Sequence, residues 1–76
     1  MKWRIIRSLG HPVPTHFRHD KTIYLSQDGR FYVGAVGEPI GWRGEKQQWE
    51  LVNAKTGDPH GRFTSAKKAK AQAEIL

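Results

Sequence analysis

Cysteine is absent from this chain of 76 residues, so no disulfide, thiolate metal site or cysteine nucleophile is available. Long apolar runs are also missing, since none approaches the roughly 20 residues of a membrane-spanning helix. Acidic residues are few, because 7 Asp and Glu stand against 13 Lys and Arg and leave a net charge of +6. We therefore expect a soluble, cytoplasmic chain that does not enter a membrane and is held together by packing of its 3 Trp, 3 Phe and 2 Tyr.

The length predicts one domain over residues 1–76, because so short a chain cannot build two independent cores. Clusters of glycine and proline separate short segments of alternating polar and apolar residues, and a segment rich in alanine and lysine comes last. This pattern predicts an α+β fold, in which a small antiparallel sheet of three to five strands packs against one C-terminal α-helix. The expected parts are a first strand and a Pro/His-rich loop over 1–21, antiparallel strands over 22–63 with a flexible loop at 37–46, and a helix over 64–76.

The alternation of residue types also assigns sheet faces. In the strand expected at 2–9, Trp3, Ile5 and Leu9 share the inward face and Ile6 points outward. In the strand expected at 47–52, Trp49 and Leu51 point inward, whereas Gln48, Glu50 and Val52 point outward. A further short strand is expected at 60–63, at the edge of the sheet because Pro59 precedes it.

The segment 27–29 (Gln-Asp-Gly) predicts a hairpin, because Gly29 can adopt a positive φ without strain. A two-residue turn would pair Ser26 with Phe31 and spread apolar residues over both faces. A three-residue loop instead pairs Leu25 with Phe31 and gathers the apolar residues on one face, so we predict this second register. Its inward residues are Ile23, Leu25, Phe31, Val33 and Ala35. Its outward residues are Thr22, Tyr24, Ser26, Arg30 and Tyr32, with Tyr24 opposite Tyr32.

Lysines crowd the start of the expected helix, where the helix dipole disfavours cations. Thr64 or Ser65 is the expected N-cap, and Ala66, Ala69, Ala73 and Leu76 form a narrow stripe for packing on the sheet. The basic residues in this region are Arg62, Lys67, Lys68 and Lys70. A phosphate bound at the helix start would offset their charge. An ordinary solvated lysine face is the alternative interpretation, and the sequence leaves both open.

Aromatic side chains beside basic ones form the second candidate binding feature. On the outward face of the hairpin these are Tyr24, Arg30 and Tyr32, which could contact bases and phosphates or could stabilise the two strands across the sheet. In the glycine-rich loop, Trp42 stands next to Arg43. Trp42 could be an exposed residue that binds a partner, or it could fold back and cover a small core.

Metal binding and catalysis have little support. His11, His16, His19 and Asp20 lie in one loop, but their spacing matches no common zinc pattern and Arg18 and Lys21 would repel a cation. Asp28 and Asp58 fall in expected turns and Glu38 and Glu45 in the loop at 37–46, so none has an evident apolar pocket, and no phosphate-binding glycine loop is present. We expect no metal, no cofactor and no enzymatic activity.

The strands from residue 22 onward and the helix that follows Phe63-Thr64-Ser65-Ala66 resemble a known architecture. They are similar to the three-stranded sheet plus helix domains of plant ethylene-response factors and to the amino-terminal domains of some tyrosine-recombinase integrases. Those domains place the outer sheet face in the major groove of DNA. The resemblance implies that Arg30, Tyr32, Gln48 and Glu50 would face DNA, with Arg43 near the backbone. Small size and basicity also resemble accessory proteins of phages and mobile elements.

These features together predict a small basic module that binds nucleic acid, with duplex DNA as the favoured polymer. The alternative function is a protein-binding inhibitor or adaptor, of the kind that phages encode, which acts on an acidic host protein through Trp42 and a sheet edge. The sequence does not discriminate between these two classes by charge alone.

Overall fold

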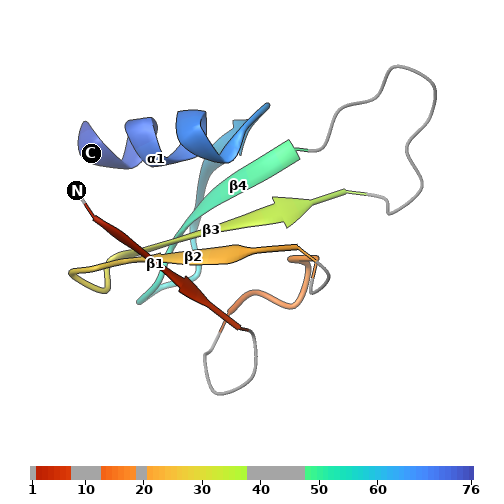
Figure 1. The fold of residues 1–76 in the computed structure, drawn as a ribbon, viewed down its shortest axis with the longest axis horizontal. Coiled ribbons are helices and arrows are strands. Elements are labelled where there is room, and N and C mark those ends of the chain that lie inside the picture. The colour runs from red at the N-terminus through yellow and green to blue at the C-terminus, as the bar shows by residue number, and fades with distance from the viewer. Residues whose placement is uncertain (1, 8–12, 19–20, 38–47) are drawn as a thin grey trace.

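The computed structural model describes residues 2–7, 13–18, 21–37 and 48–76. Five strands form one antiparallel sheet in the order in which they occur along the chain, and a helix follows them (Figure 1). The elements are β1 (Trp3–Ile6), β2 (Ile23–Ser26), β3 (Phe31–Val36), β4 (Gln48–Asn53), β5 (Pro59–Phe63) and α1 (Ala66–Glu74). The predicted α+β fold is confirmed, with β1 and β5 as the two edges of the sheet.

Helix α1 covers one face of the sheet through its small residues. Ser65 is the N-cap, since its hydroxyl accepts a hydrogen bond from the Lys68 N–H at 3.2 Å. Ala69 and Ala73 are fully buried against Phe31, Val33 and Leu51. Because alanine allows close approach, the helix lies directly over β3, β4 and β5. In the described part of the chain, no helix has the length and apolar character of a membrane span.

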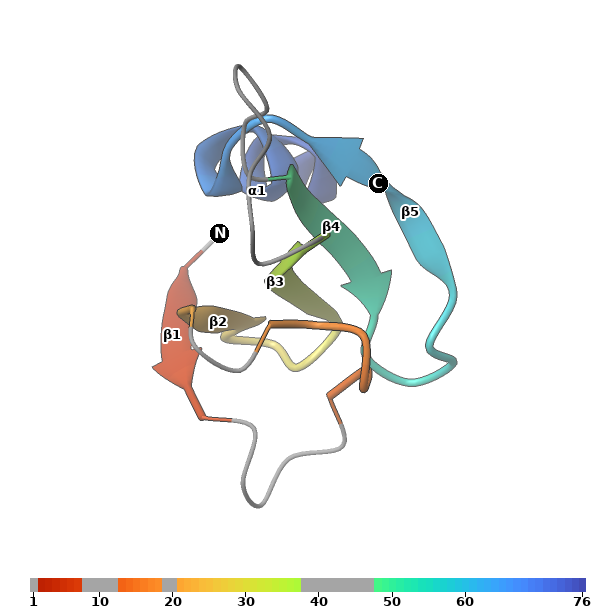
Figure 2. The same ribbon diagram turned by 90° about the vertical axis from the view of Figure 1, so that its right-hand side faces the viewer.

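The opposite face of the sheet is also covered, by residues 13–18 (Figure 2). Phe17 is only 1% exposed and lies over the centre of this face. The core beneath it consists of Ile6, Ile23, Tyr32, Val36 and Val52. The sheet therefore has two apolar cores, one under the helix and one under this connecting segment.

The predicted hairpin register is wrong by one residue. Tyr24 pairs with Val33 and Leu25 with Tyr32, so the two tyrosines lie on opposite faces. Gly29 does adopt the expected positive φ, at 77°. The prediction assumed that one face is polar, whereas both faces are buried and apolar residues are needed on each.

A buried side chain replaces backbone pairing at the hairpin turn. The Ser26 hydroxyl, 0% exposed, accepts hydrogen bonds from the N–H groups of Arg30 and Phe31 at 2.9 and 3.0 Å. It also donates to an Asp28 carboxylate oxygen at 2.7 Å. Ser26 was expected on an outward face, and its buried hydroxyl instead serves as an acceptor for these two N–H groups, of which the Arg30 N–H is shared with Asp28 Oδ1 at 3.2 Å.

Strand β1 departs from the expected facing in the same way. Trp3 packs toward the helix-side core as predicted, but Ile5 is 74% exposed and Ile6, expected outward, is buried in the second core. The reason is that α1 reaches β3, β4 and β5 and does not extend over β1. Leu9 lies outside the described residues. At the other edge, Pro59 begins β5 as expected for an edge strand.

Candidate functional site

The helix-side surface of β1 and β2 carries Trp3, Ile5 and Tyr24, and we call it the β1–β2 face. Ile5 and Tyr24 are a directly opposed cross-strand pair. Trp3 and Tyr24 are partly buried at the margin of the helix-side core. Helix α1 lies mainly over β3, β4 and β5, and it reaches the margin of this surface, where Trp3 and Tyr24 pack against the helix-side core (Figure 2). Aromatic and apolar groups are therefore presented beside the flank of the helix.

Lys70 connects the helix to this surface. Its Nζ lies 3.4 Å from the centroid of the Tyr24 ring, which is a cation–π contact. Burial lowers the pKa of Lys70 from its usual value. The Tyr24 ring also lies near that of Trp49, with centroids 6.2 Å apart and a tilt of 48°. The ammonium group of Lys70 therefore lies against an aromatic ring at a partly buried position.

Lys67 lies one helical turn before Lys70 and shares its flank of α1. Lys67 and Lys68 are both exposed. The structure therefore brings Tyr24, Lys67 and Lys70 together, as members of the predicted site. The N–H of Lys68 is used by the Ser65 cap, so this group is not available to a phosphate at the helix start.

Two predicted basic residues have carboxylate partners elsewhere. Arg30 Nε lies 2.7 Å from Asp28 Oδ2, and its guanidinium lies 5.3 Å from the Phe31 ring centroid. Hydrogen bonds from the Ser26 hydroxyl, then from the Arg30 N–H, lower the pKa of Asp28 from 3.8 to about 2. Arg62 Nε lies 3.1 Å from Glu50 Oε2 on the face opposite the helix. Neither arginine lies on the β1–β2 face.

The sheet face that the family resemblance assigned to DNA is covered at its centre. Tyr32 and Glu50 lie on this face as predicted, but each is only 4% exposed, so the expectation that they would be free to face DNA is wrong. Gln48 is exposed at the beginning of β4. The physical reason is that Phe17 and its neighbours occupy this face. Trp42 and Arg43 lie outside the described residues.

Glu50 is the centre of a polar cluster that sequence reasoning missed. The side chain of His16 contacts Glu50 Oε1, and Arg62 binds the other carboxylate oxygen. The side chains of His16 and Arg62 are 51% and 53% exposed, whereas that of Glu50 is 5% exposed. No sequence signal distinguished this carboxylate, because the alternating pattern only placed it on an outward face.

His16 was also considered as a member of a metal cluster with His11, His19 and Asp20. Those three residues lie outside the described part of the chain. Among the residues that the structure describes, no group of three or more His, Cys, Asp or Glu side chains could hold a metal ion. The contact that is described for His16 is structural, since it ties residues 13–18 to β4.

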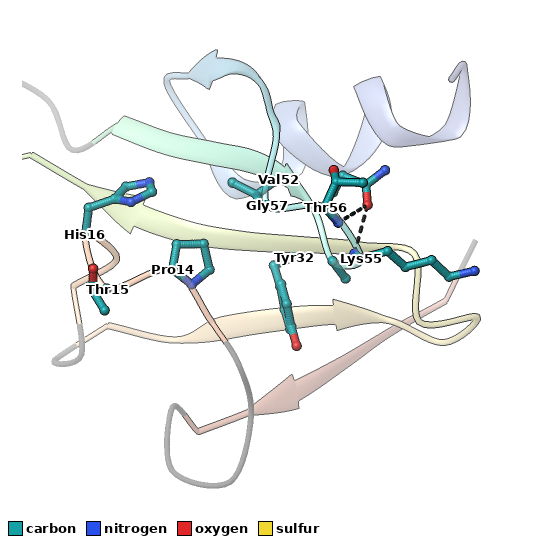
Figure 3. Close-up of a pocket in the computed structure, with 10 residues that line it drawn as sticks. Pro14, Thr15, His16, Tyr32, Val52, Lys55, Thr56 and Gly57 are labelled. Carbon is teal, nitrogen blue, oxygen red and sulfur yellow. Dashed lines mark hydrogen bonds between the residues drawn. The ribbon is translucent and has the colours of Figure 1, made fainter.

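A pocket of about 500 Å³ lies between residues 14–16 and the turn at 53–57 (Figure 3). Pro14, Tyr32, Val52 and Ala54 supply its apolar lining. The Asn53 amide oxygen accepts hydrogen bonds from the N–H groups of Lys55 and Thr56, at 2.8 and 3.0 Å. In Figure 3 the Lys55 side chain extends away from Pro14 and His16. Because this turn engages its own polar groups, it does not present a set of converging ligand contacts.

Comparisons of the chain with protein-family models, with curated proteins and with solved structures gave no match. The function must therefore be argued from the residues themselves. Among the groups described above, the β1–β2 face with Lys67 and Lys70 is the surface that combines an exposed apolar residue and two partly buried aromatic residues with positive charge.

Proposed function

We propose that this chain is a non-catalytic module that binds nucleic acid through the β1–β2 face and the adjoining flank of α1. The observation that carries the proposal is the Lys70 ammonium group, held 3.4 Å from the Tyr24 ring centroid beside an exposed apolar surface. The net charge of +6 supports attraction to a polyanion over longer distances.

The two lysines of this flank favour an anionic partner. Residues three apart on a helix are neighbours, with Cβ atoms about 5 to 6 Å apart, and like charges at this spacing repel each other. The partial burial of Lys70 adds a desolvation cost for its charged form, and this cost lowers its pKa. Phosphates beside Lys67 and Lys70 would offset both costs. Phosphate groups are the repeating anions that nucleic acids supply.

The position of the proposed interface differs from the one that the family resemblance implies. That resemblance favours duplex DNA on the face opposite the helix, where Phe17 lies over the centre of the sheet. The β1–β2 face is on the helix side and is adjacent to two of the predicted basic residues. Duplex DNA remains one of the polymers that the test below must include.

The test is fluorescence anisotropy of labelled oligonucleotides titrated with the full chain at several salt concentrations. We expect the logarithm of affinity to fall linearly with the logarithm of salt concentration. Lys67→Ala and Lys70→Ala should each reduce the slope by about 0.7 to 0.9, because each removes one phosphate contact. Lys55→Ala is the matched control, since it loses the same charge in the turn at 53–57. Equal effects of all three variants, or binding that is insensitive to salt, would contradict the proposal.

An acidic protein partner is the second candidate function, and one observation favours it. β1 is an edge strand with Ile5 74% exposed, which is a surface to which another strand could be added. In that case lysine substitutions should change mainly the association rate, whereas Ile5→Glu should increase the dissociation rate. Surface plasmon resonance with a purified acidic partner would separate the two effects.

A further inference from the structure

The side chains on the β1–β2 face suit the planar surfaces of bases better than their hydrogen-bonding edges. Trp3 and Ile5 are the helix-side residues of β1, and neither carries a group that can discriminate donors and acceptors in a DNA groove in the way that Arg, Asn or Gln can. Aromatic and apolar side chains contact the faces of bases, and these faces are accessible only where the bases are not stacked in a duplex.

The spacing of residues along β1 also favours a single strand over a duplex. Residues two apart in a strand lie on one face about 6.6 to 6.8 Å apart. The rise per nucleotide along one strand of B-form DNA is about 3.4 Å. Successive bases could therefore meet Trp3 and Ile5 only in a strand that is extended and unstacked.

Tyr24 and Lys70 have a different role on this surface. The Lys70 ammonium group already occupies one side of the Tyr24 ring, at 3.4 Å from its centroid. Tyr24 therefore acts as a support that positions the charge, and the part of the Trp3 ring that is not packed against the helix-side core is the aromatic surface left for a base. Lys67 extends the positive flank by one turn along α1. Rings on the sheet and cations on the helix flank would contact the bases and the backbone of the same strand.

We infer that the β1–β2 face binds an unpaired nucleic-acid strand, with Trp3 and Ile5 against successive bases and Lys67 and Lys70 near its phosphates. This inference rests on the proposed function and narrows it to single strands. DNA and RNA share the chemistry that the surface recognises, and the experiment contains an arm for each.

The experiment compares a labelled oligothymidine, an oligouridine and a DNA duplex of equal length, each titrated with the full chain at low salt. We expect at least one single strand to bind about tenfold or more tightly than the duplex. Trp3→Ala should weaken that binding by about 5- to 150-fold, the range found for loss of one base-stacking ring, whereas Trp3→Phe should retain most of it.

A second pair of variants avoids the risk that Trp3→Ala fails to fold. Ile5→Glu changes a residue that is 74% exposed, and Ile75→Glu makes the same chemical change at a residue that is 76% exposed at the end of α1. Stronger weakening of single-strand binding by Ile5→Glu than by Ile75→Glu supports the inference. Equal effects of the two variants overturn it.

The outcomes also separate this inference from the proposed function. Duplex binding as tight as or tighter than single-strand binding, with slopes still reduced by Lys67→Ala and Lys70→Ala, overturns the inference and leaves the proposed function standing. Failure to bind any of the three oligonucleotides at low salt overturns both, and directs the search to an acidic protein.

Discussion

The ring of Phe17 lies so close to the backbone of Gly34 that a side chain at position 34 has no room. A Cβ atom built on Gly34 would lie 2.2 Å from Phe17 Cδ2 and 2.6 Å from Cγ. Gly34 is in the middle of β3, and Phe17 is 1% exposed. This contact closes the sheet face opposite the helix and ties residues 13–18 to the sheet.

Gly34→Ala should destabilise the protein, although alanine is ordinarily tolerated in strands. The added methyl group must displace the Phe17 ring or shift β3, and overpacking of this kind costs about 1 to 3 kcal/mol. The measurement is the free energy of unfolding in urea. A matched experiment uses Phe17→Ala, which should cost about 3 to 5 kcal/mol by leaving a cavity.

The double variant Gly34→Ala with Phe17→Ala separates this contact from general damage to the fold. Once the ring is absent, the methyl group at position 34 has space, so the double variant should be more stable than the sum of the single effects predicts. Strict additivity would show that the two residues do not compete for the same volume.

The cluster around Glu50 should respond asymmetrically to substitution. Removing both His16 and Arg62 leaves a carboxylate that is 5% exposed without these two partners, which should destabilise the fold by about 3 to 5 kcal/mol. Glu50→Gln should cost less, because His16 and Arg62 are half-exposed and water can solvate them. Urea unfolding of Glu50→Gln and of the His16→Ala/Arg62→Ala double variant at pH 7 tests the order. A larger loss of stability in Glu50→Gln than in the double variant would show that the buried carboxylate does not require these two partners.

Asp28 should contribute to stability in a defined window of acid pH. Its pKa is lowered from 3.8 to about 2 in the folded chain, chiefly by the Ser26 hydroxyl and the Arg30 N–H. The stabilisation is therefore complete above pH 3.8 and is lost as the pH falls through the folded value. Carboxyl NMR titration should place the Asp28 midpoint near 2, and Asp28→Asn should flatten this part of the stability profile. A midpoint near 3.8 would show that these hydrogen bonds do not form in solution.

Tyr24 and Lys70 should be energetically coupled in the absence of any ligand. Lys70 is partly buried, and a cation–π contact contributes about 0.5 to 1 kcal/mol at an exposed site and more when it is desolvated, so we expect at least this range. In a double-mutant cycle of Tyr24→Leu and Lys70→Met, unfolding free energies should show a coupling of this size. Tyr24→Phe should preserve it, because the ring face remains. A coupling near zero would mean that the ammonium group is not held on the ring.

Much of the fold could be predicted from local features of the sequence, namely residue alternation, turn residues and helix caps. The separated alternating segments predicted an antiparallel sheet with one terminal helix, and all of these are present. Gly29 takes its positive φ and Ser65 caps the helix, because each depends on its own conformation and its immediate neighbours. Ala66, Ala69 and Ala73 of the predicted stripe meet the sheet, whereas Leu76, the fourth member, is 52% exposed beyond the end of α1, so the prediction was wrong for Leu76.

The candidate site could be predicted only in part. Lys67 and Lys70 were recognised as basic residues on a helix, and Tyr24 as an aromatic residue in a strand. The contact between Lys70 and Tyr24 depends on where α1 lies over the sheet, and residue spacing along the chain does not predict that position. Ile5 was expected in a core and is exposed, and Arg30 and Arg62, expected to be available to phosphate, are paired with carboxylates.

The sequence by itself determined the order and type of the elements, because hydrogen bonding, turn conformation and residue alternation act over a few neighbouring positions. Only the tertiary structure decided which sheet faces are covered. Alternation reveals which residues share a face, but a one-residue shift moves Tyr24 from one face to the other. Phe17 comes from a separate segment and packs on the second face, so apolar residues are buried on both faces and alternation alone does not select the register.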